Sequence, residues 1–231
     1  MHIFKTNKTK CGYIFFPTFS NYKIPKSIFN DLKTHDLNKI GCPSVNSVKN
    51  KIFSANSYLT MEVVFGLKDN QPFYKYTLDE KTTQINEDIH TILNDLCVVQ
   101  LENNVINFQL LSPYAFVTDD KELEFTTVMP NMKTENCEYI HGGFRPYYWI
   151  RNFNSSWTLK NPNKIGKLYF DLNNPFLTVI FNKSVDLEYL DPSKQILDFI
   201  SQSDRVNMIR KNLKQTYLNA SKRRPKKFLE T

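Results

Sequence analysis

Cations and aromatic rings gather between residues 139 and 170, where together they could bind a polyanion. This stretch holds both tryptophans of the chain, five Lys or Arg side chains and one His, and it contains no Asp or Glu. Arginine can contact phosphate, and tyrosine or tryptophan rings can stack on nucleic-acid bases. The pattern predicts a contact surface made of Arg145, Tyr147, Trp149 and Arg151.

The same aromatic residues are also typical of the core of a β-sheet. Alternation along the YYWIRNF sequence at residues 147–153 would bury every second side chain. Aromatic side chains of this size are usually core residues. A buried core with a cationic outer face and a binding surface therefore both remain open as interpretations.

A second basic cluster follows near the end of the sequence. Residues 1–138 carry 14 basic and 16 acidic side chains, whereas residues 139–231 carry 16 basic and 7 acidic ones, and no acid lies between Arg205 and Leu229. Cations held on a polyanion release counterions, which gives salt-sensitive binding without sequence preference. A solvated tail or a patch like a nuclear-import signal would have the same composition. The cations that we expect to make contact are Lys222, Arg223, Arg224, Lys226 and Lys227.

Motifs that would identify an enzymatic reaction are absent from the sequence. There is no P-loop, no G-x-G-x-x-G and no H-E-x-x-H, and the His141-Gly142-Gly143 triplet lacks the G-x-S-x-G sequence that accompanies it in esterases. Carboxylates at Asp119, Asp120, Glu122 and Glu124 could bind a cation, but a solvated turn is the simpler interpretation. We expect no catalytic residue, no metal site and no cofactor.

Four cysteines, at positions 11, 42, 97 and 137, are widely spaced and form no C-x-x-C. This pattern predicts free thiols in a reducing compartment. The first residues lack the apolar stretch of a signal peptide, and no apolar run approaches the roughly 18 residues that cross a membrane. We therefore expect a protein that is neither secreted nor inserted in a membrane.

The spacing of apolar residues and the positions of turn-forming residues predict mostly β-strands. The Lys68-Asp69-Asn70 turn predicts a hairpin, and Asp191-Pro192 predicts a helix with Asp191 as its N-cap. Helices are expected at residues 25–32, 44–53, 84–97 and 191–218. Strands are expected at residues 11–16, 58–67, 73–78, 105–111, 114–118, 123–129, 147–153, 156–159, 167–170, 176–181 and 185–190.

These elements predict an α+β protein with a predominantly antiparallel β core, either a sandwich or barrel-like. Residues 1–190 are expected to form a single β-rich domain with short helices. Residues 191–220 would add a helix packed on it, and residues 221–231 a flexible basic tail.

Four segments are considered together: Gly41-Cys42-Pro43 leading to Ile52-Phe53, residues 127–132, the turn at residues 142–146, and residues 175–181. These segments resemble a family of uncharacterised proteins encoded by tailed phages of marine bacteria. They cover about a third of the chain, and the resemblance implies a viral protein found in the infected host cytoplasm or in the virion. A fainter likeness to dUTPase-type β-clip proteins spans residues 164–181, although the catalytic Asp and the phosphate-binding Ser motif of those enzymes are not recognisable.

Three functions are compatible with these observations. The first is a non-enzymatic viral accessory protein that contacts nucleic acid or an acidic protein through its basic, aromatic C-terminal half. The second is a structural or assembly protein of a phage virion. The third is a nucleotide-processing enzyme of the β-clip type, which would use the carboxylates near Asp119, Asp120 or Glu124.

Overall fold

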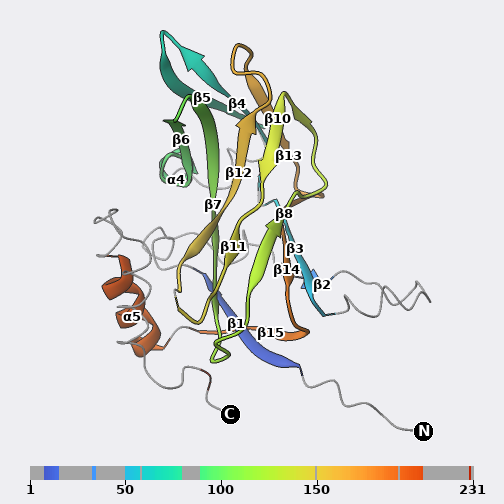
Figure 1. The fold of residues 1–231 in the computed structure, drawn as a ribbon, viewed down its shortest axis with the longest axis vertical. Coiled ribbons are helices and arrows are strands. Elements are labelled where there is room, and N and C mark those ends of the chain that lie inside the picture. Colours follow the sequence, from blue (N-terminus) through green and yellow to red (C-terminus); the bar gives the residue numbers. More distant parts are fainter. Residues whose placement is uncertain are drawn as a thin grey trace, which may run out of the picture.

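The computed structural model describes residues 8–15, 33–34, 50–57, 59–79, 89–148, 150–191, 193–204 and 229. Within these residues the chain forms three open β-sheets with helices beside them (Figure 1). Strand β1 (Thr9–Phe15) and strand β15 (Val185–Tyr189) lie at one end of the molecule, and the hairpin of β4 (Met61–Lys68) and β5 (Gln71–Leu78) lies at the other. The predicted α+β class with a β-rich core is confirmed, and the described sheets do not close into a barrel.

The largest sheet is built around β7 (Val105–Val117). One edge of β7 pairs with β12 (Asn152–Leu159). The other edge pairs first with β6 (Cys97–Glu102), through residues 105–110, and then with β1, through residues 114–117. Pro113 has no N–H to donate to a neighbouring strand. On one edge of β7 it lies between the residues that pair with β6 and those that pair with β1. On the other edge it lies opposite the register shift between Asn152 and Asn154 of β12. The two strands predicted at 105–111 and 114–118 are thus one strand, because the interruption affects the pairing and not the extended backbone.

The outer strands of this sheet are β10 (Cys137–Ile140), which pairs with β12, and β15, which pairs with β1. The β1–β15 pairing is parallel, whereas every other strand pairing among the described residues is antiparallel. This pairing brings the first described strand against a strand from the far end of the described sequence.

Two smaller sheets complete the β structure. One has the order β11-β8-β14-β3-β2, and the other has the order β5-β4-β13-β9. Their remaining members are β2 (Lys33–Thr34), β3 (Ile52–Asn56), β8 (Phe125–Val128), β9 (Thr134–Glu135), β11 (Gly143–Phe144), β13 (Gly166–Phe170) and β14 (Pro175–Phe181).

Left-handed residues form the tightest turns. Asp69 and Asn70 connect β4 to β5 with φ of 52° and 60°, and Asn103 and Asn104 connect β6 to β7 with φ of 50° and 63°. Asn and Asp adopt positive φ more readily than other non-glycine residues do. A two-residue turn in which both residues have positive φ matches the right-handed twist of the two strands that it connects. The predicted hairpin at residues 68–70 is confirmed, whereas β6 and its hairpin with β7 are additional to the predicted strands.

Aromatic side chains fill the core between the sheets. The rings of Phe116 and Phe153 stack with centroids 5.2 Å apart, and the ring of Phe125 meets Phe116 edge-on at 4.7 Å. Trp157 on β12 is fully buried. The side chains of β12 alternate between buried and half-buried, so this strand presents one face to the core as period-two alternation requires.

Two helices flank the sheets in the described part of the chain. Helix α4 (Ile89–Leu96) leads directly into β6, and helix α5 (Lys194–Asp204) follows β15. The N-cap of α5 is Ser193 and not Asp191, because the N–H of Ile196 donates to Ser193 Oγ at 3.4 Å. Among the described residues, no helix combines the length and the apolarity that crossing a bilayer requires.

Two predicted elements are wrong. Residues 146–148 form a turn, and the strand predicted at 147–153 begins only at Asn152. The turn forms because the N–H of Tyr148 donates to the carbonyl of Arg145 at 3.1 Å. Ile52 and Phe53, predicted to end a helix, lie in β3 and pair with β14. The helix predicted at 25–32, most of the one predicted at 44–53, and residues 205–218 of the last one lie outside the described residues.

Candidate functional site

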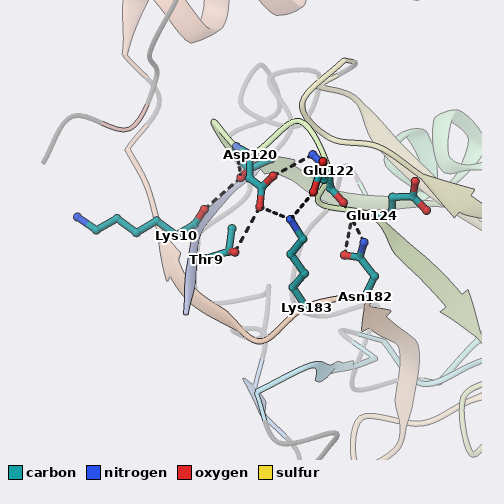
Figure 2. A network of polar contacts seen from close by, with 8 residues as sticks. Thr9, Lys10, Asp120, Glu122, Glu124, Asn182 and Lys183 are labelled. Atoms are coloured by element: carbon teal, nitrogen blue, oxygen red, sulfur yellow. Dashed lines mark hydrogen bonds and ion pairs between the residues drawn. The ribbon is translucent and has the colours of Figure 1, made fainter. Parts of the chain in front are cut away.

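The loop between β7 and β8, residues 118–124, holds together segments that are far apart in the sequence (Figure 2). Asp120 Oδ2 accepts hydrogen bonds from Lys183 Nζ at 2.9 Å and from Thr9 Oγ1 at 3.4 Å. Its Oδ1 accepts one from the N–H of Glu122 at 2.8 Å. This carboxylate therefore ties β1 to the turn between β14 and β15.

Lys183 is shared by two carboxylates of this loop, since its Nζ also lies 3.3 Å from Glu122 Oε2. Partial burial acts to raise the pKa of Asp120, but hydrogen bonds from Lys183 and from the Glu122 N–H, together with the Lys183 charge, outweigh it and lower this pKa. The hydrogen bond to Asp120 is the main cause of the raised pKa of Lys183. Both groups are therefore charged near neutral pH.

Glu124 and Asp119 bind two further parts of the chain. Glu124 forms an ion pair with Arg145, one of the predicted contact residues. Asp119 Oδ2 accepts a hydrogen bond from the N–H of Leu229 at 2.9 Å. The carboxylates that were expected to form a solvated turn thus each have a partner, and these partners come from the second half of the sequence.

Two of the other predicted contact residues, Tyr147 and Arg151, lie within the described residues and make local contacts. Tyr147 is half-buried, its ring lies 5.7 Å from Lys121 Nζ, and it meets the ring of Tyr148 edge-on at 5.1 Å. Arg151 Nε donates to the carbonyl of Asn152 at 2.9 Å. Trp149 lies outside the described residues, as do the five cations at 222–227.

The aromatic rings of the 139–170 stretch are divided between core and surface. Tyr139, Phe153 and Trp157 are buried with exposed fractions of 6%, 1% and 0%. These three rings belong to the core and are closed to any partner. Tyr147 and Tyr148, in contrast, are half-buried. They lie in the turn that directly follows Arg145.

The basic excess of the second half comes mainly from residues 205–228, which lie outside the described residues. Residues 139–204 carry seven Lys or Arg against six Asp or Glu, so this part is nearly neutral. Residues 205–228 carry nine Lys or Arg and no acid. Positive charge is therefore dense along the sequence of the segment 205–228 and nearly balanced by acidic residues within 139–204.

Both ends of this basic segment adjoin described residues that pack on the core. Before it, Ile196, Phe199 and Ile200 of α5 are buried. After it, Leu229 is half-buried and packs against the core. Leu229 also lines a cavity of about 150 Å³. The other lining residues are Lys10, Cys11 and Gly12 of β1, Asp186 and Glu188 of β15, and Leu190, which follows β15.

Three of the four cysteines lie within the described residues. Cys11, Cys97 and Cys137 are free and buried, which confirms the prediction of free thiols for these three positions. Burial raises the pKa of Cys97 to about 12 and that of Cys137 to about 11, so both thiols are protonated and unreactive near neutral pH. Among the residues that the structure describes, no three His, Cys, Asp or Glu side chains are grouped to hold a metal ion.

Sequence reasoning did not predict two parts of this arrangement. The role of Lys183 depends on a contact with Asp120 across 63 positions, and that of Leu229 on a contact with Asp119 across 110 positions. The clustering of carboxylates at 119–124 was the available signal, but it does not reveal which cations or amides will reach them. Comparison with known proteins adds no further guide, since no protein-family model, curated protein or solved structure matches this chain.

Proposed function

We propose that this protein is a non-enzymatic accessory protein that binds nucleic acid through the basic segment 205–228, in keeping with its resemblance to phage-encoded proteins. The observation that carries the proposal is the charge of this segment, with nine Lys or Arg and no Asp or Glu in 24 residues. Each cation that meets a phosphate releases a counterion, so a segment of this density gives substantial, salt-dependent affinity without base-specific contacts.

The folded sheets support this function by their contrast with the basic segment. Arg145 and Lys183 are paired with carboxylates of the 118–124 loop, and Lys167 Nζ lies 3.7 Å from Glu135. Their charge is offset locally, which leaves the segment 205–228 as the part of the sequence where positive charge has no acid near it in the chain. Arg145, Tyr147, Trp149 and Arg151 are secondary contacts in this proposal.

A nucleic acid fits this charge pattern better than an acidic protein does. The cluster at 222–227 places five cations within six positions. A nucleic-acid strand offers a phosphate at every nucleotide, whereas most protein surfaces intersperse both signs of charge. Acidic protein partners are accordingly the alternative that the experiment must separate.

The test is fluorescence anisotropy at low salt with labelled single-stranded and double-stranded oligonucleotides of mixed sequence. The test variant replaces Lys222, Arg223, Arg224, Lys226 and Lys227 by Gln. A matched control replaces Lys8, Lys51, Lys68, Lys75 and Lys194 by Gln, which removes the same charge from described positions outside the segment.

We expect the wild-type protein and the control variant to bind, and the test variant to lose most of its affinity. Equal losses in both variants would show that net charge alone is responsible and would contradict the proposed site. Absence of binding to any oligonucleotide, with binding to polyglutamate instead, would replace nucleic acid by an acidic protein as the partner.

A further inference from the structure

Two adjacent tyrosines lie at the surface in the turn that follows β11. The rings of Tyr147 and Tyr148 are half-buried and meet edge-on, with their centroids 5.1 Å apart. Lys121, which belongs to the 118–124 loop, places its Nζ 5.7 Å from the centroid of the Tyr147 ring. The turn and the loop therefore adjoin, and Lys121, Arg145, Tyr147 and Tyr148 together are called the tyrosine turn.

The backbone that carries these rings is held by its neighbours. The N–H of Tyr148 donates to the carbonyl of Arg145 at 3.1 Å, and Pro146 between them is buried. Phe144, just before the turn, packs against the core, and Ile150, just after it, is fully buried. Because the turn is anchored on both sides, a ligand that stacks on its rings does not have to order the backbone first, which lowers the cost of binding.

Arg145 gives the tyrosine turn a cation that can change its partner. Its guanidinium forms an ion pair with Glu124, which lies on the 118–124 loop (Figure 2). The side chains of Arg145 and Glu124 are 60% and 42% exposed. Exposed ion pairs contribute little to stability, so a phosphate can replace the Glu124 carboxylate at small cost. Lys121 adds a second cation beside the rings.

Rings and cations in this arrangement fit a nucleic acid whose bases are unpaired. Every base has a π-face that can stack on an aromatic side chain, and every nucleotide has a phosphate that a neighbouring cation can contact. In a duplex the neighbouring base pairs already cover these faces, so a ring on a protein surface does not reach them. The basic segment 205–228 meets phosphates, which both forms of nucleic acid present, and the two tyrosines would distinguish between them.

We propose that Tyr147 and Tyr148 stack on unpaired bases while Arg145 and Lys121 contact the adjoining phosphates, so that the protein favours single-stranded over double-stranded nucleic acid. The inference rests on the proposed function and names the form of nucleic acid that it binds. Stacking uses a chemistry that DNA and RNA share, so strands of both kinds serve as probes.

The test is fluorescence anisotropy at low salt with a labelled single-stranded DNA, the single-stranded RNA of the same sequence and the corresponding DNA duplex. Tyr147→Leu and Tyr148→Leu remove one ring each, whereas Tyr147→Phe and Tyr148→Phe keep it. Tyr169→Leu is the matched control, because Tyr169 is also half-buried and has Lys133 Nζ 4.6 Å from its ring centroid, but lies on β13 in another sheet. Urea unfolding checks that each variant is folded.

We expect the wild-type protein to bind both single strands more tightly than the duplex. Each Leu variant should lower the affinity for the single strands about fivefold or more and leave the affinity for the duplex unchanged. The slope of log Kobs against log salt concentration should not change in these variants, because a neutral ring neutralises no phosphate. The Phe variants and Tyr169→Leu should match the wild-type protein.

The ion pair between Arg145 and Glu124 supplies a second readout, in which the two partners act with opposite sign. Arg145→Gln should weaken single-strand binding and make its salt slope shallower by about 0.7. Glu124→Gln removes the carboxylate that competes with phosphate for Arg145, so it should raise the affinity for single strands about twofold. A loss of affinity in Glu124→Gln would refute this exchange of partners.

The remaining outcomes separate this inference from the proposed function. Equal losses for single strands and duplex in the Leu variants, or Phe variants that bind as weakly as the Leu variants, would refute stacking. The same loss in Tyr169→Leu would refute the tyrosine turn as its place. All three results leave the proposed function intact as long as the wild-type protein binds oligonucleotides, whereas absence of binding by the wild-type protein refutes the proposed function and this inference together.

Discussion

Replacement of Gly12 by Ala should destabilise the protein through one identifiable neighbour, Leu190. The added Cβ would lie 1.9 Å from Leu190 Cδ1 and 2.4 Å from its Cγ, whereas carbon atoms in contact prefer about 3.5–4.0 Å. Gly12 pairs with Val117 on one side and with Glu188 on the other, so its backbone cannot yield. Leu190 must therefore leave its position.

The expected cost follows from two opposing terms. Overpacking of a well-packed site costs about 1–3 kcal/mol. Gly12 does not have positive φ, so Ala can adopt its conformation and should recover about 0.4–1 kcal/mol by restricting the unfolded chain. We expect Gly12→Ala to lower the free energy of unfolding by about 1–2 kcal/mol in the wild-type background.

The decisive comparison is the same substitution in a Leu190→Ala background. That background lacks the Cγ and Cδ atoms of Leu190 that would clash, so Gly12→Ala should then be neutral or slightly stabilising, and the two substitutions should show strong coupling in a double-mutant cycle. Urea unfolding followed by the fluorescence of the buried Trp157 measures each free energy. An equal cost of Gly12→Ala in both backgrounds would refute the proposed contact with Leu190.

Two further predictions concern polar side chains. Asn136→Ala should cost about 2 kcal/mol, because Asn136 Nδ2 lies within 3.2 Å of the carbonyls of Asn161, Lys164 and Ile165, and because its φ of 54° disfavours Ala. Glycine tolerates this φ, so Asn136→Gly removes the hydrogen bonds without the backbone strain. If Asn136→Gly lowers the free energy of unfolding as much as Asn136→Ala does, the whole loss belongs to the hydrogen bonds. If Asn136→Gly leaves the free energy of unfolding unchanged, the hydrogen bonds are unimportant and the prediction is contradicted. Asp120→Asn should cost about 1 kcal/mol near neutral pH. The folded-state pKa of Asp120 is below its ordinary value, so its contribution is present above that ordinary value and is lost as pH falls through the folded-state pKa. The unfolding free energies of wild type and variant should therefore converge in acid, and a difference that persists there would contradict an ionic origin.

Local sequence signals predicted those parts of the fold that depend on neighbouring residues. The β4–β5 hairpin was predictable because Asp69 and Asn70 both suit a left-handed turn. The buried face of α5 was predictable because Ile196 and Ile200 recur at helical spacing. In such cases the backbone preference and the packed structure agree.

Predictions failed where tertiary contacts decide between local alternatives. Tyr147 and Tyr148 suit a strand by propensity, but Pro146 and the hydrogen bond from Tyr148 to Arg145 turn the chain there. Ile52 and Phe53 have the spacing of a helix, but pairing with β14 makes them a strand. Strand β6 follows α4 without a loop, so the sequence offered no turn residue to separate them.

The candidate site was predictable in its charges and not in its contacts. The basic segment 205–228 is visible from composition alone. The partners of Asp119 and Asp120 are Leu229 and Lys183, which a fold must bring to them across long stretches of the chain. No local pattern encodes such contacts, because they depend on the parallel pairing of β1 with β15 and on the position of the 118–124 loop.

The salt dependence of nucleic-acid binding tests the central claim most directly. For duplex DNA, the slope of log Kobs against log salt concentration is about −0.9 for each phosphate neutralised. If the five cations at 222–227 each contact a phosphate, replacing all five by Gln should make the slope shallower by about 4.5. The matched five-lysine control should leave the slope nearly unchanged. A slope that is the same in the wild-type protein and in the variant lacking these five cations would contradict the account.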